Sequence, residues 1–292
     1  MDQRIIDLYD NFTHDRIDRR TFMERLTVLA GSTAAATALL PVLSNDYAKA
    51  AIVAPDDPRL VIERITYPAP DGGAVKGYMA RPAQGAGKRP AVIVVHENRG
   101  LNPHIEDVTR RMGLEGFVAF APDMLSLDGG TPTNEDQARE MIGKLDAQKT
   151  IARLAAAVPF LAQFPASTGA VGAIGFCWGG GMVNQLAAAS DQLKAAVAYY
   201  GRQLPADKVP AIKGAVMLHY AGLDQGINAG IPAYEEALKK AGTTYELFMY
   251  EGANHAFNND TNAPRYNKEA ADLAWKRTVE FLKKHLGDTR PA

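Results

Sequence analysis

A short glycine-flanked segment in the middle of the chain constrains the fold more strongly than any other feature. The apolar run Ala170-Val171-Gly172-Ala173-Ile174 leads into Gly175-Phe176-Cys177-Trp178-Gly179-Gly180, which holds the single cysteine of the 292 residues. Glycines on both sides of a residue permit a turn that would be too sharp for larger side chains. The sequence therefore predicts a buried strand, a sharp turn at Cys177 and then a helix.

A turn of this kind suits a reactive side chain. In the arrangement known as a nucleophile elbow, the turn lifts the attacking group above the edge of the sheet. A thiol at the start of a helix also meets free backbone N–H groups and the positive end of the helix dipole, which favour the thiolate. A buried, inert cysteine is the alternative, but the flanking glycines favour a nucleophile.

An activated nucleophile needs a base and a group that orients the base. Asp224 follows one expected strand, and His255 lies in a loop rich in glycine and asparagine after the last expected strand. This order of nucleophile, acid and histidine is the order found in α/β-hydrolases. Of the other histidines, His14 belongs to the N-terminal extension, and His219 lies inside a strand, where core packing is expected.

The elbow, Asp224 and the motif Asn254-His255-Ala256-Phe257 together resemble the dienelactone hydrolase family, over roughly residues 60–286. The resemblance implies cleavage of a lactone or carboxylic ester through a thioester acyl-enzyme. It implies Cys177 as the nucleophile, His255 as the base and then the acid, and Asp224 as the group that orients the imidazole.

The loop after the expected strand 91–95 matches the same family. The resemblance implies that Glu97 contacts the resting thiol, and that the backbone N–H groups of Asn98 and Trp178 stabilise the oxyanion. Preorganised donors of this kind supply roughly 3–4 kcal/mol each to acyl transfer.

The sequence departs from the family in the part that determines substrate choice. Members that act on dienelactone hold its carboxylate with arginines, one of them shortly after the catalytic histidine. Here Asn259 stands near that place, and the next arginine is Arg265. Other candidate arginines, all expected to be solvated at the surface, are Arg99, Arg139 and Arg202. The sequence therefore predicts that neutral esters are cleaved at least as well as carboxylated ones.

Aromatic side chains are the candidate walls of the substrate pocket, although each also fits the core. They are Trp178, Tyr199, Tyr200 and Phe257. No cofactor and no metal are expected. A metal site made of His96, Glu97 and His104 is disfavoured because these residues do not have a metal-ligand spacing.

The periodicity of the chain predicts an α/β-hydrolase fold, an eight-stranded and mostly parallel sheet with helices on both faces. The expected strands are 61–67, 74–80, 91–95, 117–120, 170–176, 195–200, 215–220 and 245–250. The expected helices are 105–114, 134–164, 180–189, 232–241 and 266–286. The first two strands are expected to pair as an antiparallel hairpin through Asp71-Gly72-Gly73.

Composition excludes some classes of function. The charge is −1, and lysines and arginines are balanced by carboxylates without a basic stripe, so nucleic-acid binding is disfavoured. The expected partner is a small-molecule ester or lactone, and a homo-oligomer is left open. A thiol redox protein is disfavoured because no second cysteine can resolve a sulfenate. A catalytically silent binding module is disfavoured because the three catalytic residue types are all present.

Residues 1–50 carry a signal separate from that of the hydrolase domain at 51–292. The segment 18–24, Asp-Arg-Arg-Thr-Phe-Met-Glu, resembles a twin-arginine export motif, and it is followed by the apolar stretch 27–43 and the cleavage pattern Ala48-Lys49-Ala50. This predicts a periplasmic or secreted enzyme without a stable membrane span. The alternative is a cytoplasmic enzyme with an uncleaved helical arm, which the helical spacing of Ile5, Leu8, Tyr9 and Phe12 supports.

Overall fold

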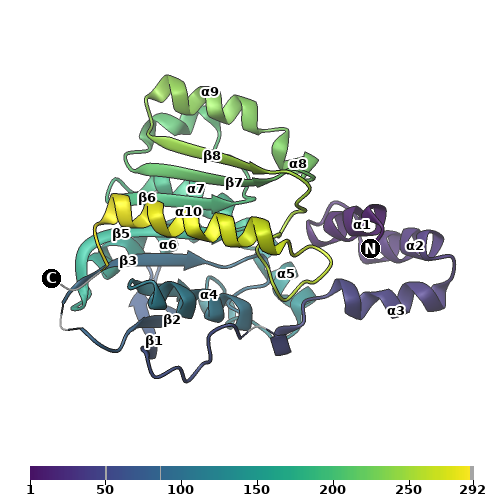
Figure 1. The fold of residues 1–292 in the computed structure, drawn as a ribbon, viewed down its shortest axis with the longest axis horizontal. Helices are drawn as coiled ribbons and strands as arrows, with labels where there is room; N and C mark the ends of the chain where they lie inside the picture. The colour runs from purple at the N-terminus through teal and green to yellow at the C-terminus, as the bar shows by residue number, and fades with distance from the viewer. Residues whose placement is uncertain (50, 86, 290–292) are drawn as a thin grey trace.

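The computed structural model describes residues 1–49, 51–85 and 87–289, which contain an eight-stranded β-sheet with helices against it (Figure 1). The strands are β1 (Leu60–Pro68), β2 (Ala74–Pro82), β3 (Arg89–Val95), β4 (Val118–Pro122), β5 (Ser167–Phe176), β6 (Leu193–Tyr199), β7 (Ala215–Ala221) and β8 (Tyr245–Tyr250). Their order across the sheet is β1-β2-β4-β3-β5-β6-β7-β8. β2 pairs antiparallel with β1 and β4, and every other pairing is parallel. The predicted sheet is confirmed.

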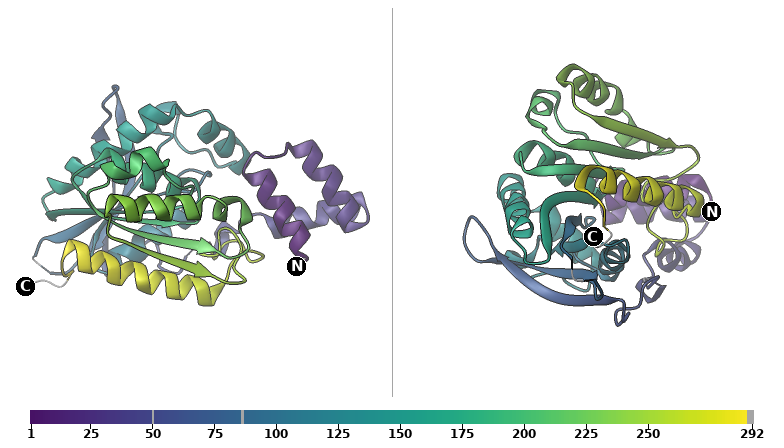
Figure 2. Two further views of the ribbon diagram at one scale, coloured as in Figure 1. Left: turned by 90° about the horizontal axis from the view of Figure 1, so that it is seen from above. Right: turned by 60° about the vertical axis from the view of Figure 1, so that its left-hand side comes forward.

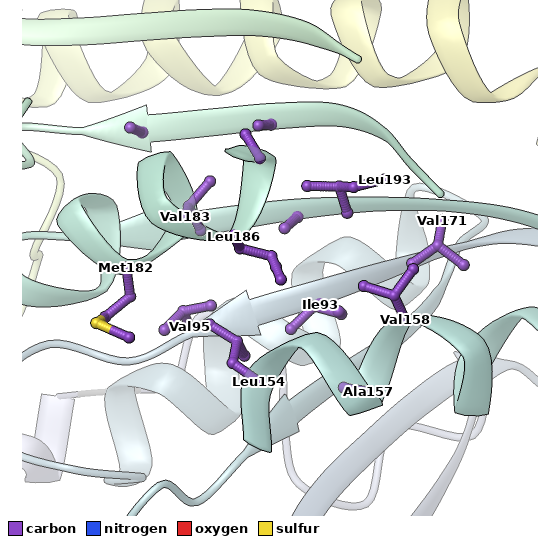
Figure 3. Packing of buried hydrophobic residues seen from close by; sticks show 14 of the residues in the cluster. Ile93, Val95, Leu154, Ala157, Val158, Val171, Met182, Val183, Leu186 and Leu193 are labelled. Carbon is purple, nitrogen blue, oxygen red and sulfur yellow. The ribbon is translucent and has the colours of Figure 1, made fainter. Parts of the chain in front are cut away.

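Helices cover both faces of the sheet, because its central strands are apolar on both sides. In β3, Ile93 and Val95 belong to one core cluster, whereas Val92 and Val94 belong to the other. The first cluster lies under α6 (Ala147–Ala162), α7 (Trp178–Ala189) and α9 (Ile231–Ala241). The second lies under α4 (Pro103–Leu114) and α10 (Lys268–Leu286). Figure 3 shows the first cluster, with Leu154 of α6 and Leu186 of α7 close to β3.

The expected helix 134–164 is two helices in the structure. α5 (Glu135–Gly143) ends before Lys144, and α6 starts after Asp146, whose side chain accepts a hydrogen bond from the backbone N–H of Lys149. An aspartate that caps a helix start competes with the continuous helix that the apolar periodicity predicts. The prediction of one helix was therefore wrong at this break.

The predicted hairpin between β1 and β2 is confirmed. Gly72 and Gly73 both have positive φ, at 96° and 79°, which explains why glycines occupy the turn. Short elements complete the body of the protein: α8 (Gln225–Asn228) and 3₁₀ turns at Tyr47–Lys49, Ser126–Asp128 and Ala206–Ala211.

Residues 1–43 form three helices, α1 (Gln3–Thr13), α2 (Arg19–Ala30) and α3 (Thr33–Leu43), here called the N-terminal arm. Figures 1 and 2 show the arm, in purple, beside the end of the sheet toward which the arrow of β3 points. The arm has its own apolar cluster, which includes the predicted helical face: Ile5, Leu8, Tyr9, Phe12, Phe22, Leu26, Ala36 and Leu43. No single helix in the described ranges has the length and apolarity to span a membrane; α2 and α3 do so only as a pair bent by 110°. Ala50 of the predicted cleavage pattern lies outside the described residues.

Candidate active site

Cys177 occupies a strained turn between β5 and α7. Its φ and ψ are 54° and −115°, a conformation that side chains rarely adopt and that costs on the order of 1–3 kcal/mol. A Cβ on Gly175 would meet the carbonyl of Gly179, and a Cβ on Gly179 would meet the carbonyl of Val95 at the end of β3. The glycines of the motif therefore let α7 start against two strands. The turn at Cys177 that the sequence predicts places the thiol at the N-terminus of that helix.

Asp224 and His255 come together because β7 and β8 are neighbouring parallel strands. The loops that follow the two strands leave the sheet at the same edge, and the backbone N–H of Leu223 donates to the carbonyl of Ala253 over 3.0 Å. Nδ1 of His255 donates to Oδ2 of Asp224 over 2.5 Å, and both side chains are buried. This bond leaves Nε2 of His255 directed away from the acid, on the side of the ring that faces the elbow.

A second imidazole reaches the elbow from the N-terminal arm. Nε2 of His14 lies 3.3 Å from Sγ of Cys177 and 3.1 Å from Nε2 of His255. Nδ1 of His14 donates to the backbone carbonyl of Asp10 over 2.8 Å. Setting His14 aside as part of the extension was wrong. No local motif marks it, because only the folded arm brings it to the site.

These contacts shift the pKa of the thiol and the imidazoles. Burial raises the pKa of Cys177, but the positive charges of His14 and His255 outweigh it and bring the pKa from 9.0 down to about 6. Burial lowers the pKa of His14, yet the Cys177 thiolate and a hydrogen bond to Asp10 raise it to about 9. At neutral pH the cluster therefore holds a thiolate beside an imidazolium.

Glu97 and the two proposed oxyanion donors also lie at the elbow. Glu97 and Asn98 line the same cavity as Cys177. Oε2 of Glu97 accepts from Nδ2 of Asn259 over 2.8 Å, whereas Sγ of Cys177 is within hydrogen-bond distance of Nε2 of His14. Trp178 is the first residue of α7, so its backbone N–H has no acceptor within the helix.

Three of the four aromatic residues predicted as pocket walls, Tyr199, Tyr200 and Phe257, are buried in this structure. Tyr199 and Phe257 have no exposed surface, and the hydroxyl of Tyr199 hydrogen-bonds to Oγ1 of Thr278. Tyr200 is buried against the ring of His255, with 4.9 Å between centroids. Trp178 is half-buried and stacks on His96. Aromatic residues of a core and of a pocket wall have the same sequence pattern, which is why the sequence left both roles open.

Two arginines stand closer to the thiol than the sequence predicts. Arg99 and Arg265 are buried and line the cavity that contains Cys177. Arg139 is buried as well, under the arm, and Arg202 is exposed as expected. The expectation that Arg99 and Arg139 are solvated was wrong, because the arm covers both of them. The sequence did not predict that Arg265 lies near Cys177, because the folding of the loop that follows His255, and not the sequence spacing, brings the two residues together.

The arm closes the site. The cavity around Cys177 has a volume of about 20 Å³, and its walls include Thr13 and His14 of the arm. A space of this size admits about one water molecule and no ester. Nη1 of Arg139 donates to the carbonyl of Phe12 over 2.5 Å and to Asp15 over 2.9 Å, and its guanidinium lies over the Phe12 ring. Nδ2 of Asn98 donates to the carbonyl of Thr13.

The sheet order, the elbow and the acid–histidine pair after the last strands define an α/β-hydrolase. The model of the dienelactone hydrolase family matches residues 75–286, and a model described as YqhI-like matches residues 1–31. The chain therefore belongs to the dienelactone hydrolase family.

Relatives and solved structures agree with this membership. A protein of Methylorubrum extorquens named "Putative carboxymethylenebutenolidase" is 35% identical over 283 residues, covering 91% of this chain and 94% of the relative. One of the same name from Escherichia coli O157:H7 is 32% identical, covering 84% and 94%. A crystal structure described as "Putative Dienelactone Hydrolase" from Klebsiella pneumoniae superposes with a TM-score of 0.71 at 29% identity, covering 77% of this chain and 99% of that one.

Loosening the arm should expose the thiol. Arg139→Gln removes charge-assisted hydrogen bonds to Phe12 and Asp15, which are worth about 1.5–3 kcal/mol, so alkylation of Cys177 by iodoacetamide should accelerate by about 10- to 150-fold. The exposed Arg59→Gln variant is the matched control and should react at the parental rate. Equal rates in all three proteins would mean that the arm does not limit access.

The thiolate should depend on His14. Ultraviolet absorbance of the thiolate, read against a Cys177→Ala blank in chelator-treated buffer, should give a midpoint near pH 6, with the thiolate present above it. In His14→Ala the midpoint should rise by about 1–3 pH units, because a cation beside the thiolate is lost. His285→Ala should leave the midpoint in place, and an unchanged midpoint in His14→Ala would separate His14 from the thiol.

Proposed function

We propose that this hydrolase cleaves lactones or carboxylic esters through a Cys177–His255–Asp224 triad and a thioester acyl-enzyme. One observation carries the proposal: the only cysteine of the chain stands at the apex of a strained elbow, within reach of an imidazole that is hydrogen-bonded to a buried aspartate. Membership of the dienelactone hydrolase family supports the same reaction class.

In the proposed reaction the Cys177 thiolate attacks the carbonyl carbon of the ester. The oxyanion that forms is stabilised by the backbone N–H groups of Asn98 and Trp178. His255 then donates a proton to the departing alkoxide, which leaves as an alcohol or, from a lactone, stays on the acyl group as a hydroxyl. His255 next takes a proton from water, the hydroxide attacks the thioester, and the acid leaves as Cys177 is regenerated.

Substrate entry requires the arm to move. The closed cavity is too small for an ester, and Nε2 of His14 takes the place beside Sγ where a scissile carbonyl would lie. We infer that His14 acts in the resting state, in which its positive charge keeps the thiol ionised, and that it withdraws with the arm when substrate binds.

The buried arginines change the expected substrate. Arg99 and Arg265 face the same cavity as Cys177, and Nη1 of Arg265 lies 3.6 Å from Oδ1 of Asp10 in the arm. When the arm withdraws, Arg265 loses this carboxylate. We propose that an anionic group of the substrate replaces it, so that a carboxylated lactone or ester is preferred to a neutral one. Relatives named carboxymethylenebutenolidase are consistent with this choice.

The twin-arginine interpretation of residues 1–50 stays a prediction. The contacts of the arm with Cys177, Asn98 and Arg139 support the alternative, which is a cytoplasmic enzyme with an uncleaved arm. Mass spectrometry of the protein from its own host separates the two, because export predicts a mature chain that begins at Ala51.

The triad is tested by its own variants. Cys177→Ala should fold and lose about 10⁴ to 10⁶ in kcat toward an aryl ester, and combining it with His255→Ala should cost hardly more, since the residues act as a unit. Asp224→Asn should be less damaging than His255→Ala. Intact-mass measurement after rapid quenching should find the acyl adduct on the parental enzyme and not on Cys177→Ala. Near-parental turnover by Cys177→Ala would refute the triad.

Substrate charge is tested on Arg265. The parental enzyme should cleave a dienelactone faster than its methyl ester, and Arg265→Gln should reduce this ratio of kcat/KM by about 10- to 150-fold, the value of one charge-assisted hydrogen bond. Arg202→Gln, at an exposed arginine, is the control and should keep the ratio. Equal cleavage of the acid and the ester by the parental enzyme would favour the substrate range that the sequence alone predicts.

A further inference from the structure

Three ligand atoms converge where the arm meets the elbow. Nε2 of His14, Sγ of Cys177 and Nε2 of His255 all lie within 4.8 Å of one another. Two of the separations are 3.3 Å, from His14 to Cys177, and 3.1 Å, between the two imidazoles. Two nitrogens and a thiolate sulfur are a donor set that suits zinc.

The hydrogen bonds of the two Nδ1 atoms determine whether each Nε2 can offer a lone pair. Nδ1 of His14 contacts the backbone carbonyl of Asp10, and Nδ1 of His255 contacts the Asp224 carboxylate. Both partners are acceptors, so each Nδ1 carries a hydrogen, and once the proton held between the rings is released each ring directs a lone pair from Nε2 toward the centre. With the thiolate, three electron-pair donors then face one point, and a cation among them, either a proton or a metal ion, relieves their repulsion.

The geometry points to a metal ion as that cation: we propose that His14, Cys177 and His255 bind one Zn²⁺ when the arm is closed. Zn–N bonds of about 2.0–2.1 Å and Zn–S bonds of about 2.3 Å in a tetrahedron place the ligand atoms about 3.3–3.6 Å apart. The separations of 3.3 and 3.1 Å that His14 makes with Cys177 and His255 need to open only slightly. Binding releases to solvent the proton that the thiolate and the imidazoles otherwise share, and no redox step is involved.

The surroundings of the three atoms match those of a metal centre. Metal-bound histidines usually donate their other ring N–H to a carboxylate or a carbonyl, as both rings do here. Oδ1 of Asp10 is buried without a hydrogen bond and lies 3.3 Å from Nδ1 of His14, where it adds negative charge to the second layer. The adjoining cavity of about 20 Å³ has room for one water as a fourth ligand.

Charges around the proposed site balance those of the ion. The carboxylates of Glu97, Asp10 and Asp224 lie around it. The two nearby guanidiniums are themselves opposed: Arg265 by Asp10 at 3.6 Å, and Arg99 by Glu135 and Asp136 at 3.9 and 3.8 Å.

The bound ion would hold the arm and the body together through side chains of both. It would occupy the sulfur and the imidazole nitrogen that the proposed hydrolysis uses, so Zn²⁺ would act as a reversible inhibitor and the arm as part of its site. This inhibition rests on the proposed function, whereas the binding of the metal does not.

Binding is tested by titrating the chelator-treated full-length protein with Co²⁺, a spectroscopic substitute for Zn²⁺. We expect one Co²⁺ per chain, an intense visible band typical of four-coordinate cobalt, a near-ultraviolet thiolate-to-cobalt band, and loss of both bands when Zn²⁺ is added. His14→Ala and Cys177→Ser should weaken binding by at least about 100-fold, more than the effect typical of a second-layer residue. His285→Ala, a histidine outside the cluster, should bind like the parent.

Three results would overturn the proposal: Co²⁺ bound without the thiolate band, binding unchanged in His14→Ala, or no binding at millimolar metal, in which case a shared proton is the cation. Circular dichroism confirms that the variants fold, and His14→Gln serves as a second variant of similar bulk. In an esterase assay, Zn²⁺ should inhibit the parent more strongly than His14→Ala. Metal binding in a protein that has no esterase activity even after chelator treatment would refute the proposed function and leave the metal site standing.

Discussion

The close approach of α7 to β3 and β5 is the constraint on which the site depends. The first turn of α7 lies against the carbonyl of Val95, and a Cβ at Gly175 or Gly179 would prevent this contact. Because the helix starts there, Cys177 must adopt its strained backbone conformation, and its thiol lies above the carboxyl edge of the sheet. The loops after β3, β7 and β8 end at the same edge, so Glu97, Asp224 and His255 surround a position that the elbow has already determined.

Electrostatics then decides the state of the thiol. Burial by itself opposes ionisation of Cys177, and the helix start offers only a partial positive charge. The two imidazoles reverse the balance, and the backbone carbonyl of Asp10 and the carboxylate of Asp224 hold those imidazoles in place on the far side of each ring. The thiol is thus kept ionised by charges that come from three separate parts of the chain.

The N-terminal arm affects both the ionisation of the Cys177 thiol and the access of solvent to it. The same His14 that favours the thiolate also covers it, and Arg139 and Asn98 hold the arm through backbone carbonyls of Phe12 and Thr13. A thiolate in a cavity of about 20 Å³ is shielded from solvent and from electrophiles in solution. Because the arm has its own apolar cluster, the withdrawal that we propose would leave the core of the body intact.

The sequence by itself determined the sheet, the elbow and the acid–histidine pair. The physical reason is local: glycine spacing at Cys177, apolar runs of strand length, and loops that must leave neighbouring parallel strands at one edge. The break before Asp146 and the burial of Tyr199 and Phe257 needed the packed structure, because core and pocket residues look alike in sequence. The tertiary structure alone brought His14 across 163 positions to Cys177 and turned Arg99 and Arg265 toward the thiol. Contacts between separately folded segments depend on the shapes of both surfaces, and no spacing within either segment encodes them.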